Sequence, residues 1–202
     1  MITSFLRGAC QASAAISIST IFGWDGEDRL LQRYIAIWTL ALAGFVAALY
    51  LTGLPGWVFV VLAGLALYRL QDLVFASLDD ALQLTPRDNQ FNVLPHGFAV
   101  QVGLVNIVQI VLIFALCLKV FAANDFDAAA NHLTTPFDYL YLSWMVLLPP
   151  GSGYNASTWV GRALSMLESG VGLLVVVLAL SSFLSRVGGG TPGGAAAPGG
   201  DA

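Results

Sequence analysis

Apolar segments alternate with short polar stretches along most of the chain. The long segments run from Tyr34 to Leu51, from Trp57 towards Arg69, from Phe98 to Ala122 and from Val160 to Leu184. A helix that crosses a membrane needs about 20 predominantly apolar residues, with aromatic residues such as Tyr34 at its ends. The pattern therefore predicts an all-α integral membrane protein with four transmembrane helices.

The second apolar segment meets Arg69 after about twelve residues. We expect its helix to continue as an amphipathic stretch from Leu70 to Leu84, which packs on the core or lies at the membrane surface. Its apolar face comprises Leu70, Leu73, Val74, Leu78, Ala81 and Leu82, and its other faces carry Gln71, Asp72, Asp79 and Asp80. The predicted unit at 34–96 is thus a two-helix hairpin with an amphipathic helix, closed by a polar loop at 85–96.

Between the third and fourth apolar segments lies the sequence PFDYLYLSWMVLLPPGSG, from Pro136 to Gly153. Its apolar part would form a helix of about twelve residues, or about 18 Å, which is too short to cross a hydrocarbon core of about 30 Å. Two prolines and a Gly-Ser-Gly follow. Irregular backbone at membrane depth is tolerated where it is buried in protein or lines a water-filled cavity. The segment therefore predicts a re-entrant helix and loop.

The start of this short helix carries a capping signal. Thr135 fits the cap position, Pro136 the first helical position and Asp138 the third. A helix that begins here directs its carbonyl end, with its partial negative charge, at the loop, where a cation is favoured. A capped helix of an unrelated fold would show the same signal.

Composition supports the membrane assignment. The 202 residues are 57% hydrophobic and 10% charged, whereas soluble domains carry about 25% charged residues. The net charge of −4 and the lack of a basic patch argue against nucleic acid as a partner. Cys10 and Cys117 sit in apolar surroundings without ligand spacing, so we interpret them as packing residues. We expect His96 and His132 in separate loops. We expect neither an enzyme nor a resident metal or cofactor; membrane lipid is the expected partner.

The positive charges predict the orientation. Arg7, Arg29, Arg33, Arg69, Arg87 and Arg186 fall on one side of four crossings, and only Lys119 and Arg162 on the other. The positive-inside rule then places both termini in the cytoplasm, in the inner (plasma) membrane of the cell, with the re-entrant loop facing outwards. We expect a cytoplasmic or interfacial segment at 1–33 and a disordered Gly/Ala/Pro-rich tail at 188–202.

Four polar residues in the apolar segments are candidates for function or for structure. Asn106 and Gln109 share one helical face, where amides usually contact other helices, although they could also coordinate an ion. Glu168 lies about two turns into the last segment. An ionisable group at that depth is a candidate functional residue; alternatively, it braces the short helix by pairing with a neighbouring hydroxyl or amide. Arg162 would be an interfacial anchor or a selectivity charge near the outer mouth.

The residues from 98 to 186 resemble the pore module of the two-helix potassium-channel superfamily. Leu140 to Trp144 resembles its pore helix, Gly151-Ser152-Gly153 its filter, Gly161 to Leu164 and Leu167-Glu168 the start of its inner helix, and Gly170 and Gly172 its hinge glycines. The whole chain is similar to small four-helix bacterial members, which carry an Asn and an acid or amide at the positions of Asn106 and Gln109. The resemblance implies a pore module at 97–187, with Asp138, Ser143 and Trp144 on the pore helix, that assembles as a homotetramer.

The filter departs from this pattern. Leu148, Pro149 and Pro150 stand where the family has Thr-Thr-Val/Leu, and Ser152 replaces an aromatic residue. Such filters use backbone carbonyls and an inner ring of threonine hydroxyls, and prolines remove amide donors. Gly151 and Gly153 retain the freedom to adopt φ > 0. We therefore expect a pore with weak selectivity among monovalent cations; the alternative is a non-conducting scaffold or partner subunit with a channel fold.

Overall fold

The computed structural model describes residues 28–49, 54–82, 96–123, 135–147 and 156–188, together with positions 6, 8, 9, 125 and 133. The elements formed by these residues are α-helices: α3 (Asp28–Ala48), α4 (Gly56–Leu82), α5 (His96–Phe121), α6 (Pro136–Leu147) and α7 (Trp159–Gly188). The all-α class is confirmed. His96, expected in a loop, is the first residue of α5. Cys10, His132, the segments 85–95 and 189–202, and most of 1–33 lie outside the described residues.

Three of the helices are long and apolar enough to cross a membrane. Their qualifying segments are Gly56–Leu78 in α4, Gln101–Phe121 in α5 and Trp159–Ser181 in α7. The apolar part of α3 is shorter and runs from Arg33 to Ala48, a length of about 24 Å at 1.5 Å per residue. Within the described residues, three candidate spans thus stand where four were expected, and the structure is compatible with a membrane protein.

α4 continues without interruption through Arg69. The expected continuation of this helix as an amphipathic stretch is therefore confirmed as far as Leu82. Leu70 and Leu73 are buried, as their place on the apolar face predicted. Arginine is a good helix former, so a charged residue in the sequence does not end a helix if its charge is satisfied.

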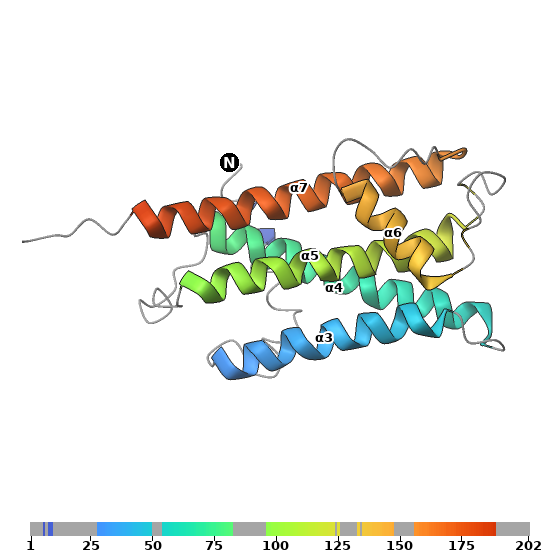
Figure 1. The fold of residues 1–202 in the computed structure, drawn as a ribbon, viewed down its shortest axis with the longest axis horizontal. Coiled ribbons are helices and arrows are strands. Elements are labelled where there is room, and N and C mark those ends of the chain that lie inside the picture. Colours follow the sequence, from blue (N-terminus) through green and yellow to red (C-terminus); the bar gives the residue numbers. More distant parts are fainter. Residues whose placement is uncertain are drawn as a thin grey trace, which may run out of the picture.

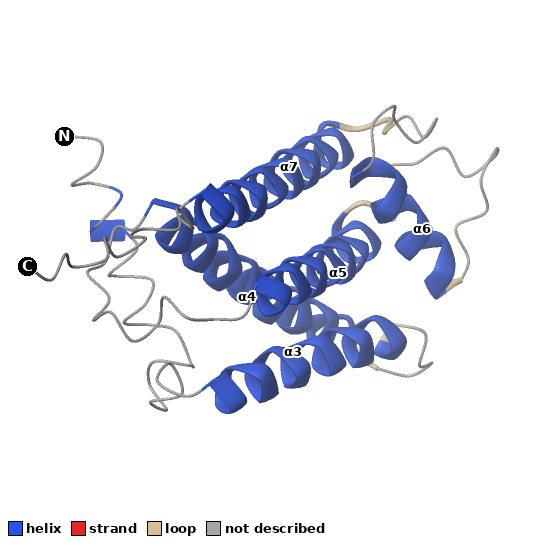
Figure 2. Cartoon of the chain, turned by 60° about the vertical axis from the view of Figure 1, so that its left-hand side comes forward, coloured by secondary structure: helices blue, strands red, loops and turns tan. Residues whose placement is uncertain are grey.

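α5 is the central helix of the bundle. Every residue from Ile110 to Leu118 is buried, and a helix that is apolar all round is typical of a position inside the protein. α3, α4 and α7 lie around it, and α6 lies at the end of the bundle where α5 ends and α7 begins (Figures 1 and 2). Cys117 is buried in this core, as expected for a packing residue.

Candidate functional site between α5, α6 and α7

α6 begins at the residues that the capping signal indicated. The backbone N–H of Thr135 donates to Asp138 Oδ2 at 2.6 Å, and the N–H of Asp138 donates to the Thr135 carbonyl at 3.1 Å. Pro136 occupies the first helical position, where its missing N–H removes no helix bond. The helix ends at Leu147 after 12 residues, so the expected short helix is confirmed.

The residues just after α5 and just before α7 are joined by hydrogen bonds. Both the backbone N–H and the hydroxyl of Ser157, just before α7, donate to the carbonyl of Asp125, just after α5, each at 2.6 Å. The intervening segment therefore begins and ends at the same end of the bundle, and α6 belongs to that segment (Figure 1).

The Asp125 side chain caps α7. Its Oδ2 accepts hydrogen bonds from the Thr158 hydroxyl and from the N–H of Gly161, the latter at 2.9 Å. A carboxylate is favoured here because the first N–H groups of a helix are unpaired and carry partial positive charge. A Cβ at Gly161 would lie 2.9 Å from Ala156 Cβ and 3.0 Å from Asp125 Cβ, so glycine is needed for this approach.

A buried pair joins α6 to α7. Ser143 and Glu168 are both 0% exposed, and the Ser143 hydroxyl forms a hydrogen bond with Glu168 Oε1. The same hydroxyl oxygen lies 3.0 Å from the Val111 carbonyl oxygen of α5. The expectation that Glu168 braces the short helix through a hydroxyl is confirmed. The second carboxyl oxygen, Oε2, is buried without a hydrogen-bond partner.

The carboxyl end of α6 also rests on α7. The Ser169 hydroxyl donates to the Val146 carbonyl at 3.0 Å, and thus satisfies one of the last, otherwise unpaired carbonyls of α6. At Gly172 an added Cβ would lie 2.2 Å from Leu147 Cδ1, whereas at Gly170 it would meet nothing within 4 Å. α7 remains helical through both glycines. Gly172 is therefore a packing contact for α6 in this structure.

The remaining predicted residues of this region are placed less centrally. Trp144 is 44% exposed on α6. Arg162 is exposed, and its Nε donates to the Ala156 carbonyl at 3.0 Å, which ties it to the turn before α7. The filter-like residues Leu148 to Gly153 lie outside the described residues.

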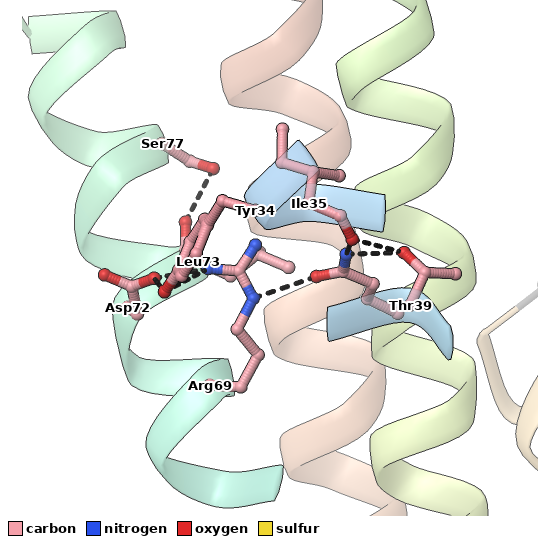
Figure 3. Close-up of polar contacts among 8 residues, drawn as sticks. Tyr34, Ile35, Thr39, Arg69, Asp72, Leu73 and Ser77 are labelled. Carbon is pink, nitrogen blue, oxygen red and sulfur yellow. Dashed lines mark hydrogen bonds and ion pairs between the residues drawn. The ribbon is translucent and has the colours of Figure 1, made fainter. Parts of the chain in front are cut away.

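A second polar cluster joins α3, α4 and α5 (Figure 3). Arg69 Nε donates to Gln109 Oε1 at 3.0 Å. Gln109 Nε2 in turn lies 2.8 Å from Thr39 Oγ1 and 3.1 Å from the Ile35 carbonyl, to which it can donate. The interhelical role expected of Gln109 is therefore confirmed. Asn106, one turn earlier on α5, is half-buried.

Arg69 and Asp72 of α4 form an ion pair within this cluster (Figure 3). The Tyr34 hydroxyl donates to Asp72 Oδ2 at 2.9 Å, and Arg69 Cζ lies 4.9 Å from the centroid of the Tyr34 ring. The guanidinium thus has a counter-ion, an amide acceptor and an aromatic face, which together make its burial tolerable.

These contacts correct three expectations. Arg69 is 4% exposed inside a candidate span, so it is not a loop charge, and the positive-inside count becomes five against two (six minus Arg69). Tyr34 is 3% exposed, in contrast to an aromatic residue at the membrane surface. Asp72 is directed into the cluster and is half-buried. Asp72 stands three residues after Arg69 on the same helix, which is the spacing of a local ion pair. Tyr34 and Gln109, in contrast, come from other helices and have no local spacing to Arg69.

The chain matches no family model, no curated protein and no solved structure. Within the described residues, no group of three or more His, Cys, Asp or Glu side chains could hold a metal ion. Functional interpretation therefore depends on the geometry of α5, α6 and α7 and on the sequence of the segment that joins them.

Proposed function

We propose that the chain is one subunit of a channel-like membrane pore, with α6 as a re-entrant pore helix. The observation that carries the proposal is the pair of hydrogen bonds from Ser157 to Asp125. They return the chain to the end of α5 after an excursion that contains a helix of only 12 residues. A helix of about 18 Å can enter a membrane from one side but cannot cross it.

The proposal assigns α5 as the outer helix and α7 as the inner helix of the pore. The carbonyl end of α6 then directs partial negative charge towards the loop of Leu148 to Gly153. Ser143, Glu168 and Ser169 hold that end in place through the contacts described above. In this arrangement α3 is a fourth span, whose short apolar part the bilayer accommodates by local thinning, and both termini are cytoplasmic.

One loop does not enclose a pore, so the proposal requires a homotetramer in which four loops form a ring. α6 and α7 offer apolar surface for contacts between copies. Their large exposed apolar side chains are Phe137, Tyr141, Trp144, Trp159, Met166, Leu167, Leu173, Leu174, Val177, Leu180 and Leu184. In a tetramer part of this surface faces the neighbouring copies and the rest faces lipid.

Selectivity follows from the sequence of the loop. Carbonyls of Gly151 and Gly153 supply the outer part of a site that replaces the water around a cation. Leu148 offers no hydroxyl for the inner part, and the two prolines offer no amide donors to hold the loop from behind. The proposed pore therefore discriminates weakly between potassium and sodium.

A non-conducting subunit is the second candidate function, and the Pro149-Pro150 pair is the observation that favours it. Such a protein keeps the channel fold as a scaffold or as a partner of other subunits. The two candidates share the same chain fold and differ in whether cations pass.

The assembly can be tested by native mass measurement of the full chain in mild detergent. We expect a tetramer, which Trp144→Gln on the exposed face of α6 weakens. Trp57→Gln, at the exposed start of α4 and outside α6 and α7, is the matched control and should leave the tetramer intact. A stable monomer or dimer of the unaltered chain would contradict the proposed pore.

A further inference from the structure

If Glu168 is ionised, the Ser143 hydroxyl faces two acceptors with only one hydrogen to donate. The Ser143 oxygen lies within hydrogen-bond distance of both the Val111 carbonyl and Glu168 Oε1. A hydroxyl has one hydrogen, a carbonyl can only accept, and an ionised carboxylate can only accept. Both contacts are satisfied together only if Ser143 donates to Val111 and the Glu168 carboxyl donates to Ser143.

The surroundings of Glu168 offer no compensation for a negative charge. Its side chain is fully buried, its Oε2 has no partner, and no Lys or Arg among the described residues forms an ion pair with it. An unpaired charge in such a site costs far more than one unpaired carbonyl oxygen of a neutral acid. The burial of Glu168 without a counter-ion thus favours the neutral acid independently of the number of hydrogens on Ser143.

The helices packed around Glu168 carry other titratable groups, and these have positions of their own. On α5, Cys117 is a buried free thiol, and Lys119 Nζ lies 4.9 Å from the centroid of the Tyr139 ring of α6. Arg69 of α4 is paired with Asp72. On α7, Arg162 binds the Ala156 carbonyl. None of these contacts supplies a cation to Glu168. Among the side chains that the structure describes on these helices, the remaining titratable groups are Tyr68, Asp138 and Tyr141.

We propose that Glu168 is a neutral carboxylic acid in the folded protein and positions α6 by donating its proton to Ser143. The protonated carboxyl thus joins α7 to α6 through a hydrogen bond. Loss of this proton would leave a buried charge on Glu168 and a Ser143 hydroxyl with two acceptors and one hydrogen. The protonation of Glu168 can be measured on the full chain in detergent, and the result does not depend on whether the protein conducts cations.

Infrared spectroscopy tests the proton directly. Folded protein should show the carbonyl band of a protonated carboxylic acid at neutral pH, and Glu168→Gln should remove that band. Asp125→Asn is the control: the Asp125 carboxyl accepts hydrogen bonds from Thr158 and Gly161 and takes no part in the contact between Glu168 and Ser143, so this variant should leave the band assigned to Glu168 unchanged. Absence of a protonated-acid band assigned to Glu168 would overturn the proposal.

The dependence of stability on pH gives a second readout. A proton held in the folded chain and released from the unfolded chain makes unfolding more favourable as pH rises. The folding constant of the unaltered protein should therefore fall, relative to that of Glu168→Gln, by up to about tenfold per pH unit above about 4.3, where an exposed glutamic acid ionises. Glu168→Gln keeps a neutral donor and should retain stability at pH 7, whereas Glu168→Ala should lose it.

Parallel pH profiles for the unaltered protein and Glu168→Gln would overturn the proposal, because an ionised Glu168 that accepts from Ser143 loses no proton on unfolding at neutral pH. The proposal would also be contradicted if Glu168→Gln destabilised the protein markedly at neutral pH while Ser143→Ala caused a far smaller loss of stability. The charge of Glu168, and not its proton on Ser143, would then stabilise the fold. One infrared outcome requires no variant: if the unaltered folded protein shows no protonated-acid band at all at neutral pH, the proposal is overturned.

Discussion

The close approach of Asp125 to the start of α7 makes Gly161 intolerant of a side chain. A Cβ at this position would meet Ala156 Cβ at 2.9 Å, Asp125 Cβ at 3.0 Å and Asp125 Oδ2 at 3.2 Å. Two of these three atoms are Cβ atoms fixed to the backbone, so rotation of a side chain cannot relieve the contact. Gly161→Ala must therefore move the backbone on one side of the cap.

The cost can be set against the gain in helix propensity. Overpacking of a well-packed site costs about 1–3 kcal/mol, and loss of the bond from the Gly161 N–H to a charged acceptor costs roughly 1.5–3 kcal/mol. Alanine in place of glycine returns up to about 1 kcal/mol inside a helix. We expect a net loss of about 1.5–5 kcal/mol, and at roughly 2–4 °C per kcal/mol a Tm that is clearly lower.

Thermal unfolding of the full chain in mild detergent, followed by circular dichroism, measures this effect. Gly170→Ala is the matched control, since it adds the same methyl group to α7 where nothing lies within 4 Å. Its Tm should be unchanged or slightly raised. Equal Tm values for Gly161→Ala and Gly170→Ala would mean that Asp125 does not cap α7. The close approach of the end of α5 to the start of α7 would then be refuted.

Further substitutions probe the other contacts, each followed by thermal unfolding unless stated. Arg69→Met should cost up to about 3–5 kcal/mol by leaving the half-buried Asp72 without its counter-ion, and adding Asp72→Leu should recover much of the loss; failure of the double substitution to recover stability would refute the ion pair. Gln109→Leu should cost about 1–3 kcal/mol, because it leaves Arg69 Nε unsatisfied. Asp138→Ala should cost about 0.5–2 kcal/mol at the start of α6. Cysteines placed in the loop at 124–135 should react from outside the cell, and labelling from the inside would refute the orientation.

The sequence predicted the helices well where local signals decide them. The apolar segments located α4, α5 and α7, and the Thr135-Pro136-Asp138 signal located the start of α6 to the residue. Capping and helix length depend on neighbours in sequence, so a single chain is sufficient to predict them.

Contacts between helices could be predicted only in part. The need of Glu168 for a polar neighbour was foreseeable because an ionisable group in an apolar helix requires one, although Ser143 itself was not identified. Arg69 was counted among the charges on the cytoplasmic side because a charge in an apolar segment indicates the end of the membrane-spanning part. The tertiary structure satisfies that charge through Gln109 and Tyr34, which lie far from it in sequence. Asp125 was missed for the same reason, since a cap supplied from another segment has no fixed spacing.

Cation flux across reconstituted vesicles tests the central claim most directly. Purified full-length protein, confirmed as a tetramer, should pass potassium and sodium at comparable rates. Gly153→Val should abolish the flux by removing a position that favours φ > 0, while the exposed Gly170→Ala variant should retain it. Strong preference for potassium would contradict the account of Leu148 and Pro149, and absence of flux of either ion from a folded tetramer would contradict the proposed pore and favour the non-conducting subunit.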